Sequence, residues 1–164
     1  MSVATPSLNP APAPAPAVTV RLATPDDLPE THRMLIALAA RTGAQGRITP
    51  PVLARIALEG RAARLLVAQR TDSPQRHPVG FALLLVGRNM VAGADWGFVE
   101  QLYVQEPDRK RGIGRALLAA ARQMAARAGC QGVTISSQPE IDGSALVWRA
   151  LGLDLSEAPR FAAE

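Results

Sequence analysis

Apolar residues follow two different periods along this chain. Alternating or β-rich runs predict strands, which fall at residues 18–22, 64–69, 79–86, 96–104 and 133–136. Apolar residues at helical spacing predict helices, which fall at residues 25–40, 52–58, 113–128 and 144–150. One further strand is expected after Leu153. Strands and helices that mix in this order predict an α/β fold.

The connections between the predicted strands indicate how the strands pair. A polar, proline-containing connector separates the runs 64–69 and 79–86, which is typical of an antiparallel hairpin with a long loop. A turn region over 87–95 then leads into the strand 96–104. The strand, helix and strand that follow require a right-handed crossover and a parallel pair. The predicted sheet is therefore mostly antiparallel, contains one parallel pair and is flanked by helices.

Local signals set the boundaries of the domain. Proline and alanine alternate within the first 17 residues, which is typical of an extended, polyproline-like tail. Thr24 is the expected N-cap of the first helix, with Pro25 at the first helical position and acids in the first turn. Gly129 ends the long helix. The sequence thus predicts a flexible tail over 1–17 and a single domain over 18–164, and its 48% apolar residues are enough for a proper core.

The charge pattern favours a small anionic ligand over a nucleic acid. The formal net charge is +4 and the sequence pI is near 10.5, and almost every basic residue is an arginine. Aromatic residues make up only 4% of the chain, and the arginines are scattered except over 109–115. A nucleic-acid binder would show an affinity that falls steeply with salt. We therefore expect no nucleic-acid partner.

Cysteine, histidine and hydropathy patterns limit the remaining classes of protein. Cys130 is the single cysteine, so no internal disulfide can form and a cytoplasmic location is expected. Because Cys130 lies between a helix end and a strand, a structural thiol is favoured over a reactive one. His32 and His77 lack a partner at ligand spacing, which argues against a metal site. No run approaches the ~18 apolar residues of a membrane span, so no membrane partner is expected.

The glycine loop before the long helix is the strongest chemical signal in the sequence. It consists of Arg109, Lys110, Arg111, Gly112, Ile113, Gly114 and Arg115. The first N–H groups of a helix lack intrahelical partners and carry the positive end of the helix dipole, so they can bind a phosphate. Gly112 and Gly114 leave room for an anion against the backbone, and the basic residues add charge.

Two other phosphate-binding loops need residues that this sequence lacks, and one simpler interpretation stays open. A dinucleotide fingerprint would need a third glycine where Leu117 stands, together with an acid about 20 residues further on. A nucleotide-triphosphate loop would need Gly-Lys-Ser/Thr, which this sequence lacks. A plain basic surface turn before a helix remains the alternative.

The spacing Arg-x-x-Gly-x-Gly after a strand resembles the pyrophosphate loop of the GNAT superfamily of acetyltransferases. The resemblance covers about residues 18–153. It implies a fold in which the strand before the loop splays from its parallel neighbour, with acetyl-CoA in the gap. The pyrophosphate would then lie on residues 109–115. Backbone groups of the preceding strand would bind the pantetheine arm, and by the resemblance they belong to Leu102, Tyr103 and Val104.

The resemblance also suggests residues for the chemistry. Glu100 is the one acid within the mostly apolar strand 96–104 and is the candidate general base, because burial would raise its pKa toward the working pH. A glutamate paired with a nearby arginine is the alternative. The last helix, which is expected to contact the coenzyme through Ser144 and Trp148, often supplies a tyrosine acid in this family, but here Trp148 holds that position. Tyr103, the only tyrosine, alternates to the face opposite Glu100 and is a weak replacement.

The resemblance therefore implies an N-acetyltransferase. The expected reaction is direct attack by a primary amine of a small molecule or peptide on the acetyl thioester within a ternary complex. The resemblance implies that the loop over 41–51 faces this acceptor, and family habit suggests a homodimer. A non-catalytic acyl-CoA-binding module of the same fold is the alternative, favoured by Trp148.

Overall fold

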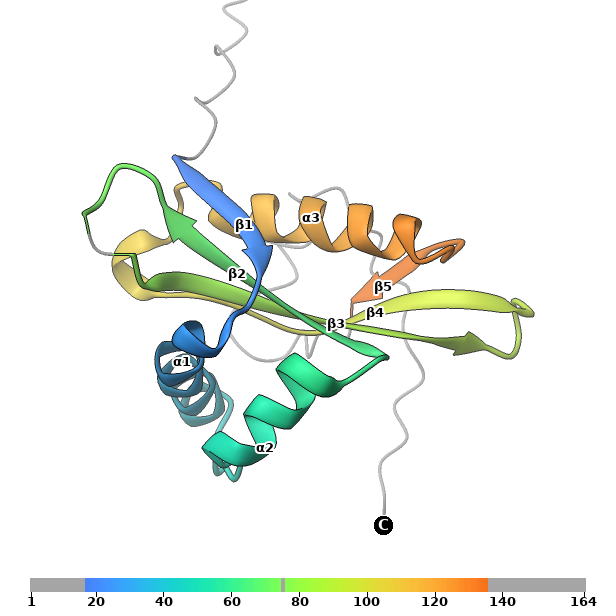
Figure 1. The fold of residues 1–164 in the computed structure, drawn as a ribbon, viewed down its shortest axis with the longest axis horizontal. Helices are drawn as coiled ribbons and strands as arrows, with labels where there is room; N and C mark the ends of the chain where they lie inside the picture. Colours follow the sequence, from blue (N-terminus) through green and yellow to red (C-terminus); the bar gives the residue numbers. More distant parts are fainter. Residues whose placement is uncertain (1–16, 75, 136–164) are drawn as a thin grey trace, which may run out of the picture.

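The computed structural model describes residues 17–74 and 76–135 of the 164-residue chain (Figure 1). In chain order its elements are β1 (Val18–Leu22), a first 3-10 turn (Pro25–Asp27), α1 (Leu28–Arg41), α2 (Pro50–Ala54), a π-helical turn (Arg55–Glu59), β2 (Ala63–Arg70), β3 (Pro78–Asn89), β4 (Ala94–Val104), a second 3-10 turn (Glu106–Asp108), α3 (Ile113–Arg127) and β5 (Val133–Ile135). Most of the predicted tail, the predicted helix over 144–150 and the strand expected after Leu153 lie outside the described residues.

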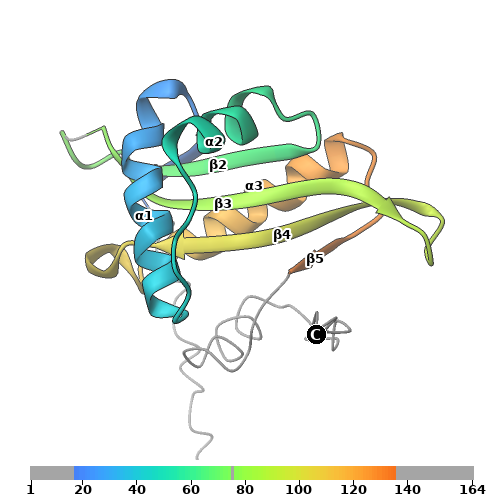
Figure 2. The ribbon, with the colours of Figure 1, turned by 90° about the horizontal axis from the view of Figure 1, so that it is seen from below.

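The five described strands form one mixed sheet in the order β1-β2-β3-β4-β5. The first four strands pair antiparallel with one another, and β5 pairs parallel to β4 from Gly97↔Val133 to Val99↔Ile135. α3 joins β4 to β5 and covers one face of the sheet, while α1 and α2 cover the other (Figures 1 and 2). This arrangement confirms the predicted α/β fold with a mostly antiparallel sheet and one parallel pair.

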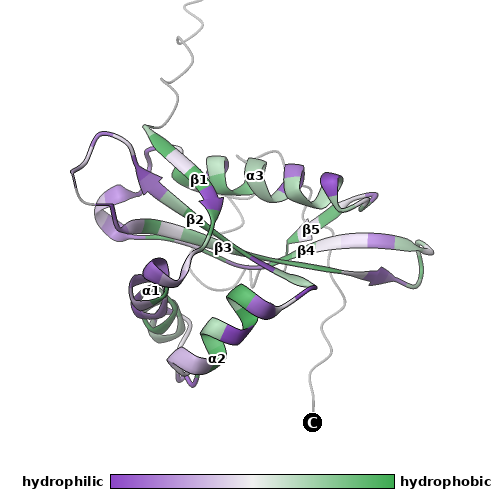
Figure 3. Ribbon diagram, viewed as in Figure 1, coloured by the Kyte–Doolittle hydropathy of each residue, from purple (hydrophilic) through white to green (hydrophobic). Residues whose placement is uncertain are grey.

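Each face of the sheet has its own hydrophobic core, because the apolar central strands are covered on both sides (Figure 3). Against α3, the buried core contains Leu66, Ala68, Ala82, Leu84, Val99, Ile113, Leu117, Leu118, Ala121 and Ala125. Against α1 and α2, it contains Met34, Leu53, Leu65, Val67 and Phe81. Neighbouring residues of β2 and of β3 therefore point to opposite cores, as the pleat of a strand requires.

The hairpin between β3 and β4 is tighter than the predicted one. The sequence predicts a turn over 87–95, but the ladder continues to Asn89 and leaves only residues 90–93 as the turn. The side-chain oxygen of Asn89 accepts hydrogen bonds from the backbone N–H groups of Val91 and Ala92, both at 3.0 Å. This local bonding closes the turn early, so both strands are longer than predicted.

The second helix differs from the prediction in its winding. Residues 52–58 are expected as α-helix, but α2 ends at Ala54 and the π-helical turn Arg55–Glu59 follows it. Pro50 and Pro51 begin α2 as expected, since proline is tolerated in the first turn of a helix. Wider turns of this kind occur frequently at functional sites, and this one lines a cavity described below.

A buried carboxylate organises the start of the first helix. Asp27 Oδ2 accepts hydrogen bonds from the backbone N–H of Thr24 at 2.7 Å and from the Thr24 hydroxyl at 2.9 Å, and Arg21 donates to both carboxylate oxygens. Thr24 is the N-cap with Pro25 in the first turn, as predicted, although this turn is 3-10 and α1 begins only at Leu28. Burial opposes ionisation of Asp27, but the hydrogen bonds from Arg21 and Thr24 outweigh burial and lower the carboxyl pKa below its usual value.

We predict that Asp27→Asn lowers the free energy of unfolding by about 1–2 kcal/mol near pH 7, because the charged hydrogen bonds are lost. A folded-state pKa below the unfolded value of about 3.9 contributes stability that is complete above the unfolded pKa and is lost as pH falls through the folded pKa. Urea unfolding should therefore show a difference between the two proteins that shrinks below about pH 4. Asp26→Asn, at an exposed neighbour, is the control and should change little. A difference that stays constant with pH would contradict this role of Asp27.

Candidate active site

The chain between β4 and α3 folds into a loop with two left-handed residues. After the second 3-10 turn, Lys110 has a φ of 61° and Gly112 has a φ of 79°. Glycine adopts this conformation without steric cost, whereas it is uncommon for lysine. Gly112 is the N-cap of α3, and the next residue, Ile113, is buried against the sheet. The loop is therefore anchored at the first residue of the helix, while Lys110, Arg111 and Gly112 are exposed.

The start of α3 carries no competing negative charge. α3 has no side-chain cap and no acidic residue in its first turn. Gly114 lies within the helix, and a Cβ atom there would be 3.7 Å from Leu102 Cδ2, which is ordinary van der Waals contact. The fold therefore does not need glycine at position 114. Because Gly114 has no side chain, this part of the helix start is bare. Such a start can bind an anion through its N–H groups and its dipole.

The basic side chains of the loop have different surroundings. Arg109 Nε donates a hydrogen bond to the Val104 carbonyl at 2.9 Å, and its guanidinium carbon lies 5.5 Å from the centroid of the Tyr103 ring. Arg109 thus holds the loop against the end of β4. Lys110, Arg111 and Arg115 are exposed at the surface around the helix start. The sequence reasoning treated these basic residues alike, but Arg109 also has this structural contact.

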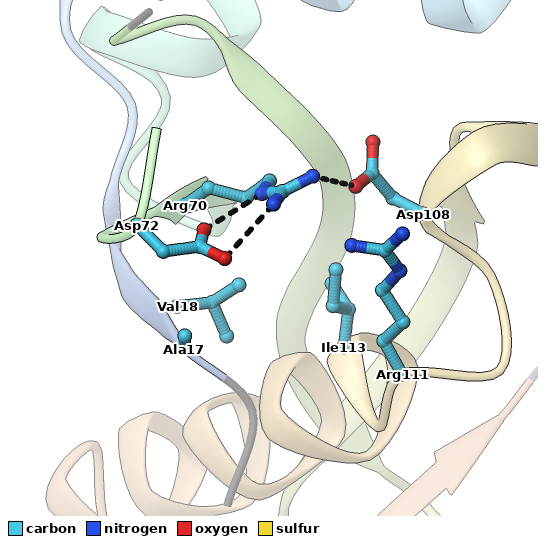
Figure 4. Close-up of a pocket in the computed structure, with 7 residues that line it drawn as sticks. All are labelled: Ala17, Val18, Arg70, Asp72, Asp108, Arg111 and Ile113. Atoms are coloured by element: carbon cyan, nitrogen blue, oxygen red, sulfur yellow. Dashed lines mark hydrogen bonds and ion pairs between the residues drawn. The ribbon is translucent and has the colours of Figure 1, made fainter. Parts of the chain in front are cut away.

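A shielded ion pair joins the second 3-10 turn to the end of β2 (Figure 4). Asp108 Oδ1 accepts a hydrogen bond from Arg70 Nη1 at 3.0 Å, and the Asp108 side chain is only 9% exposed. Arg70 also donates to both oxygens of Asp72, whose side chain is 49% exposed. The hydrogen bonds from Arg70, with Arg111 adding positive charge, lower the pKa of Asp72. These residues line a small cavity of about 30 Å³ together with Ala17, Val18 and Ile113.

β4 contains a bulge at the candidate base. Val99 pairs with Leu84 and Gln101 pairs with Leu83, so Glu100 is the extra residue between two regular pairs. Val99 belongs to the core against α3, whereas Gln101 lines a cavity on the opposite face of the sheet. The face assigned to Glu100 from the sequence assumed strict alternation along β4, and the bulge breaks that alternation between Val99 and Gln101. Glu100 itself is half-buried.

The three residues predicted to bind the pantetheine arm follow the bulge. Leu102 and Val104 pack toward the core against α3, and Tyr103 packs toward the core against α1 and α2. The Tyr103 ring stacks on Phe81 with ring centroids 6.2 Å apart. The described pairing of β4 with β5 ends before this segment, at the Val99 pair. A coenzyme role for the backbone groups of Leu102, Tyr103 and Val104 stays a prediction.

Two predicted site residues lie outside the described part of the chain, and three residues near the site were not predicted from the sequence. Ser144 and Trp148 lie outside the described residues, so their placement at the coenzyme stays a prediction. Arg70 and Asp108 were not identified from the sequence, because they are 38 residues apart and meet only in the folded chain. Gln101 was also missed, since its face is set by the bulge rather than by residue type.

The lone thiol, Cys130, has a structural rather than a chemical environment. Burial raises the pKa of the Cys130 thiol, and Asp95 adds to the effect, which supports the structural interpretation of this cysteine. Within residues 17–74 and 76–135, no group of three or more His, Cys, Asp or Glu residues could hold a metal ion. In the same part of the chain, no helix is both long and apolar enough to cross a membrane.

Comparison with known proteins shows the family. The model of the acetyltransferase (GNAT) family matches residues 24–152, and the chain therefore belongs to this family. A search of curated proteins found no match.

Similar solved structures include three acetyltransferases. One, from Trypanosoma brucei, has 22% sequence identity and a TM-score of 0.70, with 90% of this chain and 99% of that chain covered. An aminoglycoside acetyltransferase from an uncultured soil metagenomic sample, in complex with sisomicin, has 15% identity and a TM-score of 0.73, with 90% and 96% covered. A ribosomal-protein-alanine N-acetyltransferase from Brucella melitensis biovar Abortus 2308 has 20% identity and a TM-score of 0.72, with 90% and 99% covered. At identities this low, the TM-scores show a shared fold and nothing further.

We predict that Asp108→Asn lowers the melting temperature more than Asp72→Asn does, although both carboxylates bond the same arginine. Asp108 is shielded from water beside Arg70, so its neutralisation weakens a charge-assisted hydrogen bond where solvent cannot replace it, whereas the pair with Asp72 is screened by solvent. Thermal unfolding at matched ionic strength measures both shifts. We expect a fall of several degrees only for Asp108→Asn, and equal shifts would refute this role of Asp108.

Proposed function

We propose that this chain is an N-acetyltransferase that moves the acetyl group of acetyl-CoA to a primary amine of a small molecule or peptide. The observation that carries the proposal is the bare start of α3, with a left-handed Gly112 as N-cap, no acid in the first turn and exposed basic residues beside it. Membership of the GNAT family supports acyl transfer. Both kinds of acceptor occur among the structural neighbours, whose names specify an aminoglycoside and a ribosomal-protein alanine.

In the proposed complex the diphosphate of the coenzyme lies on the helix start. Backbone N–H groups bond its oxygens, and the helix dipole and the basic side chains stabilise its charge. The Val104 carbonyl already accepts a bond from Arg109, but a carbonyl has two lone pairs and can accept a second bond from the pantetheine arm. The residues assigned to the diphosphate are Arg109, Lys110, Arg111, Gly112, Ile113, Gly114 and Arg115.

Glu100 is assigned the proton transfer. A primary amine is mostly protonated near neutral pH, since the pKa of such a group is about 10.4 in lysine, so attack requires a base. The amine nitrogen bonds to the acetyl carbonyl carbon, the carbon–sulfur bond breaks, and the amine proton passes to Glu100 directly or through water. The thiolate takes a proton from Tyr103 or from solvent. The bulge supports the choice of Glu100, because bulges next to active sites re-aim a side chain.

A non-catalytic acyl-CoA-binding module of the same fold is the second candidate. It is favoured by Trp148, whose indole stands where members of the family often carry a tyrosine and cannot release a proton at working pH. An assay of free CoA release over a panel of amines separates the two functions. Thiol release with any acceptor supports the transferase, whereas tight coenzyme binding with no release from any acceptor supports the module.

We predict that Gly114→Glu abolishes coenzyme binding without destabilising the fold. The side chain begins in ordinary contact with Leu102, and an acid in the first turn favours a helix start, so the melting temperature should stay or rise. The same carboxylate repels the diphosphate, and we expect the dissociation constant of CoA to rise ~100-fold or more by calorimetry.

The matched control for this variant is Ala126→Glu. This exposed position adds the same charge to the same helix, roughly 18 Å along its axis from Gly114, beyond the range of unscreened charge interactions. Its CoA affinity should stay within about twofold of the unchanged protein. Wild-type CoA affinity in Gly114→Glu would refute the loop assignment.

We predict that Glu100→Gln lowers kcat about 100-fold or more and flattens the rise of the rate with pH, because an amide cannot accept the proton. Steady-state rates at saturating substrate across neutral and alkaline pH measure both effects, and CoA affinity should be retained. Glu106→Gln removes the same charge from an exposed position on the second 3-10 turn and should keep the wild-type profile. If Glu100→Gln keeps the wild-type pH profile, Glu100 is not the base.

A further inference from the structure

A second cavity lies between the sheet and the helices on the face away from α3. Its volume is about 40 Å³, and its lining includes Leu35, Ile48, Ile56, Phe81, Leu83 and Gln101. Apart from Gln101, the lining residues in the described part of the chain are apolar. A single water needs roughly 10–15 Å³ on a comparable measure, so the cavity has room for a few carbon atoms rather than one solvent molecule.

The walls of this cavity are fixed by contacts between α1 and the segment that follows it. A His32 ring nitrogen and the Ile48 carbonyl share a hydrogen bond of 2.8 Å, which ties the segment to the helix. Gly46 lies directly against Ile36, because a Cβ atom at Gly46 would be 2.6 Å from Ile36 Cδ1. The hydrogen bond to Ile48 thus gives His32 a structural partner. A preformed apolar cavity with one polar group on its wall is the usual form of a small-molecule subsite.

The charges around the cavity do not suit an acceptor that carries a further ammonium group besides the reacting amine. No carboxylate is among its described lining residues. On the neighbouring α1, Glu30 already accepts a hydrogen bond from Gln105 Nε2 at 2.6 Å and pairs with Arg33. An ammonium group that entered the cavity would lose its hydration without gaining an anionic partner. An apolar group loses nothing of this kind and gains from burial.

The position of the cavity relates it to the proposed chemistry. Gln101 is on its wall, and Gln101 directly follows Glu100 at the bulge of β4, with Cα atoms about 3.8 Å apart. The strand after the bulge is the segment assigned to the pantetheine arm. A substrate whose apolar group occupied the cavity would therefore place a nearby amine at the Gln101 end, one residue along β4 from the candidate base.

From these observations we infer that the acceptor of this enzyme carries a compact apolar group of a few carbon atoms close to its amine, and that this cavity binds that group. The inference rests on the proposed transferase function and narrows its substrate class. Polycationic amines and amines with a polar end are poor acceptors. Ile56, on the π-helical turn, limits the size of the group that fits.

Two pairs of isosteric amines test the inference. n-Butylamine is compared with 3-amino-1-propanol, and n-pentylamine with 1,4-diaminobutane, by kcat/KM from CoA release and by calorimetric binding to the protein–CoA complex. We expect the alkylamine of each pair to be preferred about tenfold or more. Along the n-alkylamine series, kcat/KM should rise roughly fourfold per methylene until the cavity is full.

Variants at one cavity residue make the test specific. Ile56→Trp should remove the alkylamine preference by filling the cavity, and Ile56→Ala should move the optimum to a longer chain. Leu58→Trp, at an exposed position on the same turn that is not among the lining residues, should keep the wild-type preference. CoA affinity in every variant reports that the fold and the coenzyme site are intact.

The outcomes separate this inference from the proposed function. Equal or better use of the polar amines, or an unchanged preference in both Ile56 variants, overturns the inference while transfer itself still occurs. Absence of transfer to any amine overturns the proposed transferase function. Calorimetric binding of the amines to the protein–CoA complex then tests the cavity by itself. An alkylamine preference that Ile56→Trp removes supports the cavity as an apolar subsite, and equal binding of both amines overturns it.

Discussion

Packing of α3 across the sheet is the interaction on which the rest of the structure depends. Leu117 and Ala121 are fully buried there, and each buried leucine contributes about 1.5–3 kcal/mol relative to an exposed one. Gly97 permits a close approach, since a Cβ atom there would be 3.0 Å from that of Ala125. Ile113 extends this packing to the first turn. Because burial fixes the helix along its length, its polar start is held in place without a side-chain cap.

The charges near the loop are arranged so that the helix start remains positive. Unpaired carboxylates this close would oppose an anion, but Asp108 and Asp72 are both bonded to Arg70, and Arg111 on the same small cavity adds a second positive charge. Arg109 contacts a backbone carbonyl and an aromatic ring, neither of which carries a net negative charge. Its positive charge is therefore not neutralised by these partners. The same side chains thus shape the loop and set its potential.

The strand, loop and helix around the candidate site could be predicted because their signals are local. The strand pattern of β4, the glycine at 112 and the helical period after it each reflect a requirement of the backbone at that position. The bulge at Glu100 could not be predicted, because ordinary residue types form it and pairing with β3 decides where it falls. The Arg70–Asp108 pair likewise depends on the tertiary fold. Much of what positions the site is therefore long-range.

The bulge has a further consequence for how this strand tolerates changes in length. Val99 and Gln101 already lie on opposite faces, as consecutive residues of a regular strand would. A chain shortened by Glu100 alone would therefore restore an unbroken ladder and keep every flanking side chain on its present face. The ladder itself therefore does not depend on the inserted residue, and removing Glu100 separates what the glutamate does from the pairing of β3 with β4.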